Sequence, residues 1–264
     1  MILLKLGGSA ITDKTRESTA HHDVIHRIAR EIQNARSQNP ALNILVGHGS
    51  GSFGHYAAQK SGFGPQGEWR AYAETGAAAT QLTRIVTDIF IAEGIPVVAM
   101  QPSASAMCRD GKLVRLASEP AQVALTHGLV PLVFGDVSFD ETRRMTVIST
   151  EMIFAYLAPI LKPTRILLAG IVDGVFTGDP FKESGAQLIR EITPTNFEQI
   201  EEQLHGSHGY DVTGGMMGKV RSMLALVQQT PAITVHVINA TRAGMIERAL
   251  SEDDFAEGTL IHIE

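Results

Sequence analysis

Asn43-Ile44-Leu45-Val46-Gly47-His48-Gly49-Ser50-Gly51-Ser52-Phe53-Gly54-His55 carries an apolar run directly into a glycine-rich loop. The apolar run predicts a buried strand. The glycines at 49, 51 and 54 leave backbone N–H groups bare, and they let the chain approach an anion closely. His55 closes the loop, where it can contact whatever the glycines hold. A phosphate cradle beside a titratable donor favours phosphoryl chemistry, although many glycine-rich loops are only tight turns.

The composition of the 264-residue chain indicates a globular protein with a substantial core, because 44% of its residues are hydrophobic. Its formal net charge is -6 and it has no dense run of Lys or Arg. Nucleic acids and anionic membranes are therefore not expected as partners. No apolar run approaches the roughly 20 residues of a membrane span. The single cysteine, Cys108, excludes an internal disulfide framework and favours a cytoplasmic location.

Apolar strand-like runs alternate with helical patterns along the chain. The candidate strands are residues 2–6, 43–47, 95–100, 129–134, 165–169, 233–238 and 259–263, and the candidate helices are residues 22–38, 71–93, 118–126, 151–161 and 217–229. Continuous apolar strands separated by helices predict a mostly parallel sheet with helices on both faces. Asp110-Gly111 and the polar residues 140–144 predict the tips of two hairpins. We therefore expect one α/β unit with two lobes.

A second glycine turn follows the first candidate strand, in Lys5-Leu6-Gly7-Gly8-Ser9. A strand that ends in two glycines offers backbone N–H donors to an anion. Lys5 lies at the strand end and Lys14 in the loop behind it, so both ammonium groups are candidates for one phosphate. The same residues also fit a simple strand–loop turn with two solvated lysines, because short glycine motifs often occur without a function.

Two later segments fit a nucleotide site. Asp173-Gly174 follows a buried strand, at the sheet edge where α/β proteins place ligands, although Asp173 can equally cap a turn. Gly214-Gly215 precedes a helix that has Lys219 in its first turns. The amino end of a helix with a nearby lysine suits the phosphates of a nucleotide. A lysine is otherwise unfavourable there, and such conflicts with local rules tend to mark functional sites.

Several other kinds of site are absent from the sequence. The Walker pattern Gly-x-x-x-x-Gly-Lys-Ser/Thr does not occur, and Gly-x-Gly-x-x-Gly does not follow the first strand. No cluster of His, Cys or carboxylate residues has the spacing of a zinc site, so no metal ligands are predicted. The pattern Gly-x-Ser-x-Gly is matched only in part near Gly49, which argues against a serine hydrolase.

These four segments together resemble the amino acid kinase superfamily, and within it the isopentenyl phosphate kinases. The resemblance extends from Leu4 to about Lys219. Gly54-His55 is its most specific part, because it is similar to a motif of the isopentenyl phosphate and fosfomycin kinases whose histidine contacts the phosphate or phosphonate acceptor. Gly135-Asp136 also fits this subgroup. The resemblance implies a three-layer αβα sandwich, a homodimer, and transfer of the γ-phosphoryl group of ATP to isopentenyl phosphate, with Mg²⁺ bridging the nucleotide phosphates.

The resemblance also implies a role for each site residue. The catalytic residues would be Lys5, Lys14, His55, Glu151 and Lys219. The nucleotide would be bound by Lys5, Gly7, Gly8, Ser9, Gly51, Asp173, Gly214, Gly215 and Lys219, and the acceptor by Ser50, Gly54, His55 and Thr150. A phosphate monoester is already a nucleophile at pH 7, so no general base is required. Residues 1–264 would form one domain, with an acceptor-binding lobe at about 1–160 and a nucleotide-binding lobe at about 161–264.

The sequence departs from the family pattern at one place. The family commonly has Ser-Gly-Asp-Asp ahead of a helix that ends in Tyr-Leu-Ala, where this chain has Ser149-Thr150-Glu151-Met152. Glu151 keeps the charge of the aspartate that orients the catalytic lysines, but its carboxylate stands one methylene further out. Thr150 replaces a glycine that lets the backbone approach the acceptor. Both changes bear on the acceptor more than on the ATP site.

Three other functions fit the same residues. The first is a kinase of another small phosphate or phosphonate, such as fosfomycin. The second, less favoured because His55 has no counterpart role there, is phosphorylation of a carboxylate in acetylglutamate, aspartate or glutamate. The third is a non-catalytic nucleotide-binding sensor of the same fold, which would not need Lys5, Lys14, Lys219 and Glu151 together.

Overall fold

The computed structural model describes residues 1–205 and 215–263, and a sheet of eight strands forms its centre. The strand order is β12-β14-β13-β9-β1-β2-β6-β3. The strands are β1 (Ile2–Leu6), β2 (Ile44–His48), β3 (Val97–Ala99), β6 (Val130–Phe134), β9 (Arg165–Gly170), β12 (Glu191–Ile192), β13 (Thr234–Asn239) and β14 (Thr259–Ile261). Neighbouring strands run parallel except β13 and β14. The mostly parallel sheet predicted from the sequence is therefore confirmed.

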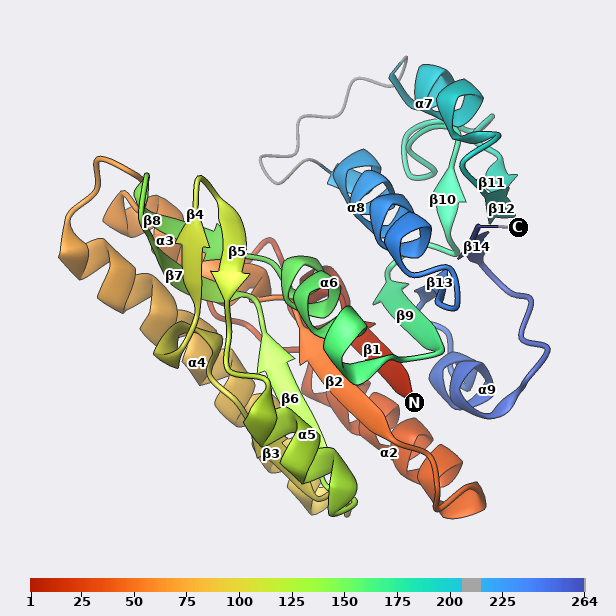
Figure 1. Cartoon of the computed structure of the whole chain (residues 1–264), viewed down its shortest axis with the longest axis horizontal. Coiled ribbons are helices and arrows are strands. Elements are labelled where there is room, and N and C mark those ends of the chain that lie inside the picture. The colour runs from red at the N-terminus through yellow and green to blue at the C-terminus, as the bar shows by residue number, and fades with distance from the viewer. Residues whose placement is uncertain (206–214, 264) are drawn as a thin grey trace.

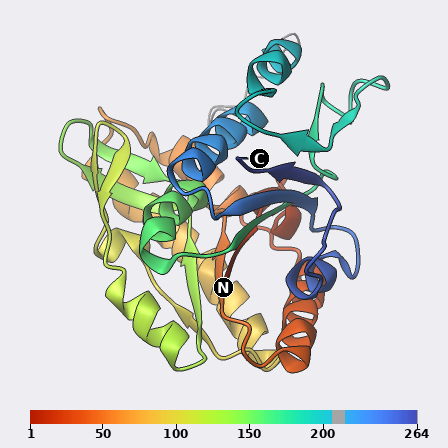
Figure 2. The ribbon, with the colours of Figure 1, turned by 45° about the vertical axis from the view of Figure 1, so that its right-hand side comes forward.

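Helices cover both faces of this sheet (Figure 1, Figure 2). One face carries α1 (Gly8–Ile11), α2 (His22–Gln38), α3 (Gly51–Ser61), α4 (Trp69–Ala92) and α9 (Met245–Ser251). The other face carries α5 (Glu119–Thr126), α6 (Thr150–Leu161), α7 (Phe197–His205) and α8 (Gly215–Gln229). The predicted three-layer αβα arrangement is confirmed, and none of the described helices is long and apolar enough to cross a membrane.

The central strands are apolar at every position because both of their faces are buried. In β1, Leu4 and Leu6 point into the core beneath α2 and α4, whereas Leu3 points into the core beneath α6 and α8. All three side chains are fully buried. Helices thus pack against both faces of the sheet and hold the ends of β1 and β2 in place.

Two smaller sheets flank the central one. The predicted hairpins are confirmed as β4 (Met107–Arg109) with β5 (Lys112–Arg115) and β7 (Asp136–Asp140) with β8 (Arg144–Ile148), which join into one four-stranded sheet. Asp140 ties the two hairpins together, because its carboxylate accepts hydrogen bonds from the backbone N–H groups of Gly111 and Arg143, each at 2.7 Å. A short ribbon of β10 (Val175–Phe176) and β11 (Leu188–Ile189) lies beyond β9, and a 3-10 turn spans Pro102–Ala104.

The structure differs from the sequence expectation at the glycine string. We expected a loop that continues to His55, but α3 already begins at Gly51, so His55 lies on a helix. Gly51 starts this helix with a φ of 54°, in the left-handed region that favours glycine. The short elements α1, α7, α9, β10, β11 and β12 were also not expected, because so few residues show no clear periodicity.

Candidate active site

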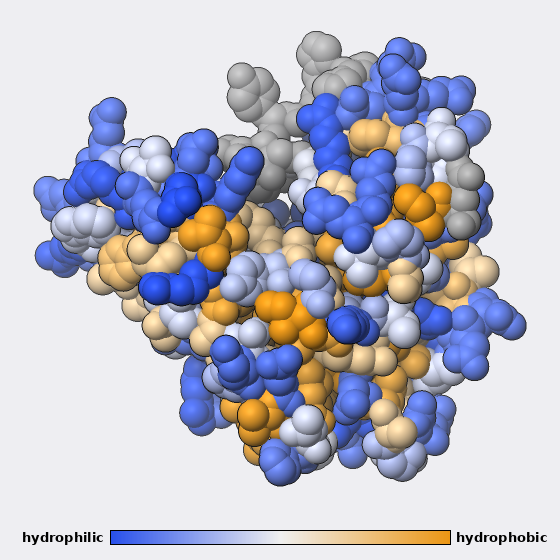
Figure 3. All heavy atoms as spheres, in the orientation of Figure 1, coloured by the Kyte–Doolittle hydropathy of each residue, from blue (hydrophilic) through white to orange (hydrophobic). Residues whose placement is uncertain are grey.

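Two glycine turns meet at the carboxyl edge of the sheet, one after β1 and one after β2. A Cβ built on Gly8 would lie 2.6 Å from the backbone nitrogen of Gly51, and a Cβ on Gly49 would lie 3.0 Å from the backbone nitrogen of Gly8. Only glycine allows so close an approach. In the space-filling view the four-stranded sheet lies on the left and the α7–α8 side on the upper right (Figure 1, Figure 3).

The two turns together present a set of unpaired donors. Four backbone N–H groups have no hydrogen-bond acceptor within residues 1–205 and 215–263, namely those of Gly8, Ser9, Ser50 and Gly51. They stand where α1 and α3 begin, so the helix dipoles add to their positive potential. Such a cradle of amides fits the phosphate oxygens of a nucleotide. Gly7 differs, because its N–H already donates to the Ala169 carbonyl at 2.7 Å.

Thr12 holds the two turns against each other, a role that the sequence did not indicate. Its hydroxyl donates to the Gly8 carbonyl at 2.7 Å and accepts from the Ser52 N–H at 3.0 Å. The residue is 1% exposed, so both bonds are shielded from water. A single threonine in a loop gives no sequence signal, and only the fold shows what it joins.

A buried ion pair lies beside this cradle. Lys5, at the end of β1, donates to the carboxylate of Glu151 in the first turn of α6, and their side chains are 11% and 7% exposed. Burial lowers the pKa of Lys5, and the nearby charges of Lys219 and Lys14 lower it further, whereas Glu151 raises it. For Glu151, burial opposes ionisation, but Lys5 and Lys219 outweigh it and hold its pKa below the usual range. Glu151 is therefore the counter-ion of the buried Lys5 ammonium group.

The other two predicted lysines both lie near Lys5, and one of them also lies near Glu151. Lys219, half-buried near the amino end of α8, lies close enough to influence the pKa of both Lys5 and Glu151. Lys14 is exposed in the loop after α1 and influences Lys5. Gly215 begins α8 with a φ of 55°, whereas Gly214 lies outside the described residues.

His55 presents one ring nitrogen outward. Its Nδ1 lies 2.7 Å from the carbonyl oxygen of Gly51. A carbonyl oxygen only accepts hydrogen bonds, so we assign the ring proton to Nδ1. Nε2 of this exposed residue has no hydrogen-bond partner within the described part of the chain, and it becomes a donor when the ring is protonated. Gly54 makes room for Ser50, since a Cβ at position 54 would lie 2.4 Å from the Ser50 hydroxyl oxygen.

The amino end of α6 lies near the Ser50 turn, on the other side of Gly135. A Cβ built on Gly135 would lie 3.7 Å from the Ser50 nitrogen and 3.8 Å from the Thr150 hydroxyl oxygen. Ser149 caps the helix, because its hydroxyl accepts from the Met152 N–H at 3.2 Å. The positive end of this helix dipole thus faces the same space as the Ser50 amide.

His48 is a structural residue beneath the site. It is fully buried, its ring lies against that of Phe134 with centroids 5.6 Å apart, and its Nε2 is 3.1 Å from the Thr83 hydroxyl. Burial lowers the pKa of His48 to about 4, so the ring is neutral at physiological pH. It supports the glycine turn from below rather than contacting a ligand.

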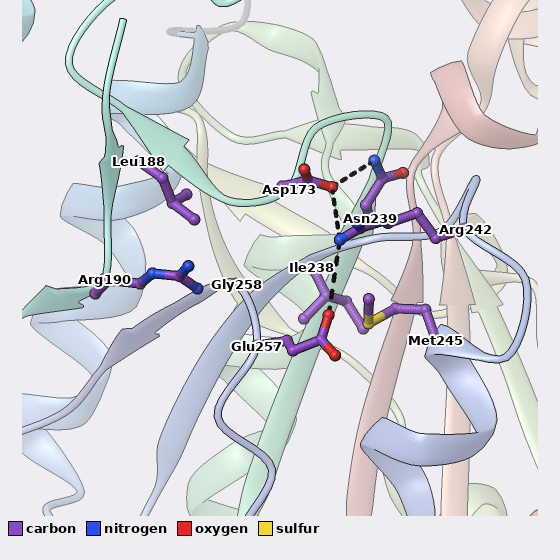
Figure 4. A pocket seen from close by; sticks show the side chains of 9 residues that line it. All are labelled: Asp173, Leu188, Arg190, Ile238, Asn239, Arg242, Met245, Glu257 and Gly258. Atoms are coloured by element: carbon purple, nitrogen blue, oxygen red, sulfur yellow. Dashed lines mark hydrogen bonds and ion pairs between the residues drawn. The ribbon is translucent and has the colours of Figure 1, made fainter.

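Asp173 lies at the edge of a pocket, beside Asn239 and Arg242 (Figure 4). Its carboxylate accepts a hydrogen bond from the Asn239 side chain at 2.9 Å and pairs with Arg242 at 3.5 Å, two partners that the sequence analysis missed. It faces a pocket of about 290 Å³ that Ile238 and Met245 line on the α9 face of the sheet. Asp173 therefore holds its own loop in place at the carboxyl edge.

The donors at this site suit phosphate groups better than a directly bound metal. Among the described residues, no three His, Cys, Asp or Glu side chains are grouped so that they could hold a metal ion. Free amides and ammonium groups are instead what phosphate oxygens require. The site therefore fits a nucleotide whose own phosphates carry a cation.

An α/β fold that gathers amides and lysines at the carboxyl edge of its sheet defines a class of proteins that bind and transfer phosphoryl groups. The chain belongs to the amino acid kinase family, whose family model matches residues 1–239. It is 38% identical to an isopentenyl phosphate kinase of Methanothermobacter thermautotrophicus, over 99% of this chain and 98% of that protein.

Two further comparisons agree. The chain is 32% identical to an isopentenyl phosphate kinase of Methanocaldococcus jannaschii, over 97% of this chain and all of that protein. A crystal structure of isopentenyl phosphate kinase matches with a TM-score of 0.83 and 35% identity, over 99% of both chains. The family resemblance seen in the sequence is therefore confirmed.

Proposed function

We propose that this protein transfers the γ-phosphoryl group of ATP to isopentenyl phosphate and so forms isopentenyl diphosphate. The full-length relatives are isopentenyl phosphate kinases, which supports this choice of acceptor. The observation in this chain that carries the proposal is the cradle of four free amides beside the Lys5–Glu151 pair, with His55 at its rim. A site for two phosphates that must meet needs positive charge on both sides.

The reaction is a single in-line displacement. An oxygen of the acceptor phosphate forms a bond to the γ-phosphorus, the bond from that phosphorus to the β–γ bridging oxygen breaks, and ADP leaves. The second ionisation of a phosphate monoester lies near pH 6, so the acceptor is already a nucleophile at pH 7. This explains why the site needs no general base.

The nucleotide phosphates take the lysine side of the site. Lys5 and Lys219 neutralise the transferring group, Lys14 adds charge from the loop, and the amides of Gly8, Ser9 and Gly51 supply fixed donors. Gly7 shapes the turn, and Gly215 lets α8 begin close to the nucleotide. Asp173 acts through its loop, which Asn239 and Arg242 hold at the nucleotide side.

The acceptor takes the other side. The Nε2 of a protonated His55 and the amide of Ser50 hold the acceptor phosphate, and Gly54 allows Ser50 to approach it. Thr150, at the start of α6, is 1% exposed and its hydroxyl donates to the His48 carbonyl, so it supports the acceptor side instead of binding the phosphate. The acceptor phosphate is thereby directed at the γ-phosphorus held by Lys5.

Four finer features belong to the same proposal. Mg²⁺ would bridge the nucleotide phosphates and otherwise bind water. The acceptor lobe would span about 1–160 and the nucleotide lobe about 161–264 of a single domain. The chain would act as a homodimer, in the cytoplasm. Sedimentation of the purified protein tests the dimer, and removal of Mg²⁺ by a chelator should stop turnover.

The test of the proposed function is an acceptor panel. The purified protein is mixed with ATP and Mg²⁺, and ADP release is followed with isopentenyl phosphate, fosfomycin and acetylglutamate in parallel. We expect fast turnover on isopentenyl phosphate alone. Turnover only on another acceptor would overturn the choice of substrate, and ATP binding without turnover on any acceptor would favour a nucleotide sensor.

A further inference from the structure

Thr150 separates the amino end of α6 from β2. It is the first residue of the helix and is 1% exposed. A Cβ built on Gly47 would lie 2.4 Å from the Thr150 methyl carbon and 2.8 Å from the Phe154 ring. The methyl group and the Phe154 ring together occupy the space that the missing side chain of Gly47 leaves, and the methyl, in the first turn, limits how closely the start of the helix can approach the strand.

The hydroxyl of Thr150 is engaged elsewhere. It donates to the carbonyl oxygen of His48 at 2.7 Å. Its only proton is thus committed to the strand and is not available to a phosphate oxygen. The His48 carbonyl also accepts from the Gly135 N–H at 2.9 Å, so it keeps a partner if the hydroxyl is removed. Thr150 is accordingly a positioning residue, whose methyl and hydroxyl both bear on β2.

Glu151, the next residue, contacts the sheet at the strand position opposite Gly47. Its carboxylate contacts the ammonium group of Lys5, and Lys5 lies directly opposite Gly47 in the pairing of β1 with β2. The helix thus contacts the sheet at Gly47 through Thr150 and binds Lys5 through Glu151. Any change in the spacing between α6 and β2 alters how far the carboxylate must extend.

We propose that Thr150 and Glu151 are a matched pair, in which the threonine methyl fixes the distance of α6 from the sheet and the glutamate length spans that distance to hold Lys5 in position. The inference rests on the proposed role of Lys5 in phosphoryl transfer. An aspartate at 151 would fall short by about one C–C bond, roughly 1.5 Å. A glycine at 150 would let the helix settle closer to Gly47, which restores the reach of that shorter side chain.

The test is a double-mutant cycle of Thr150→Gly, Glu151→Asp and the combined variant. Each single change misplaces Lys5, so we expect kcat with saturating ATP and isopentenyl phosphate to fall at least tenfold, with little change in KM for ATP. The combined variant should recover to within about threefold of the parent protein. Losses that simply multiply in the combined variant would overturn the proposal.

A second comparison separates the methyl from the hydroxyl and covers the case in which glycine at 150 impairs folding. Thr150→Val keeps the methyl and replaces the hydroxyl with a second methyl, whereas Thr150→Ser keeps the hydroxyl and loses the methyl. Spacing by the methyl predicts that the serine variant loses more kcat than the valine variant. The opposite order would contradict the matched pair. Thermal melting of each variant shows that the folded protein is being compared.

A readout that needs no acceptor keeps this inference distinct from the proposed function. The rate at which acetic anhydride labels Lys5, relative to the exposed Lys112 in the same sample, reports how well Glu151 holds the ammonium group charged. Both single changes should speed labelling of Lys5 and the combined change should slow it again. Absence of turnover by the parent protein would reject the proposed function, whereas labelling that never recovers would reject the pair.

Discussion

At the scale of single residues, His55 distinguishes the proposed binding of the acceptor from the proposed binding of the nucleotide. Its Nδ1 is bound to the Gly51 carbonyl, and Nε2, without a partner among the described residues, is the donor proposed for the acceptor phosphate. We predict that His55→Ala lowers turnover on isopentenyl phosphate by about 10²- to 10³-fold, as expected for loss of one positioned donor, and leaves ATP affinity intact. ADP release and calorimetric ATP binding measure the two effects. His127→Ala, an exposed histidine beyond α5, is the matched control, and an equal loss of ATP binding would contradict the assignment.

Glu151 controls the charge of Lys5. Burial lowers the pKa of Lys5 and Glu151 opposes that effect, so Glu151→Gln should lower the pKa of Lys5 further. If Lys5 must be charged for turnover, the alkaline limb of the kcat–pH profile moves to lower pH. Steady-state rates across alkaline pH test this, with Glu198→Gln in the first turn of α7 as the control. An unmoved alkaline limb would show that Lys5 does not set it.

At the scale of the elements, the backbones of the two glycine turns pack so tightly that there is no room for an added Cβ. A Cβ at position 8 would meet the Gly51 backbone at 2.6 Å, and backbone atoms cannot swing aside as a flexible side chain can. Gly8→Ala should therefore cost about 1–3 kcal/mol of unfolding free energy and most of the activity. Denaturant titration and ADP release measure both. Gly64→Ala is the control, because a Cβ at position 64 has open space around it, and it should change neither stability nor activity. A Gly8→Ala variant as stable and as active as the Gly64→Ala variant would disprove the tight contact.

The elements also show what the sequence alone reveals. The central strands were predicted because burial on both faces makes them continuously apolar. The helix at 22–38 was predicted because burial on one face gives it a helical periodicity. The start of α3 at Gly51 was missed, since its left-handed φ leaves no periodic trace. Lys5 and Glu151 are 146 residues apart, so local patterns could not join them, and only the family resemblance suggested their contact. The partners of Asp173 and the role of Thr12 required the fold.

At the scale of the whole molecule, stability should fall in acid. Burial lowers the pKa of His48 and of His236 to about 4, whereas both titrate near 6.5 when unfolded. The unfolded chain then binds more protons, so the stabilising effect is complete above pH 6.5 and is lost as pH falls toward 4, by about 3 kcal/mol for each histidine. Urea unfolding at about pH 7 and about pH 5 measures the loss. His48→Gln should flatten the dependence, and constant stability over this range would contradict neutral burial.

Direct transfer between two phosphates, with His55 holding the acceptor, is the central step of the proposed reaction. The most direct test uses ATP whose γ-phosphorus is made chiral with oxygen isotopes, and it determines the configuration of the transferred group in isopentenyl diphosphate. A single in-line displacement inverts the configuration, and inversion is the result that we predict. Retention would require two displacements through a phosphorylated residue, with the exposed Nε2 of His55 as the obvious nucleophile, and it would contradict the mechanism.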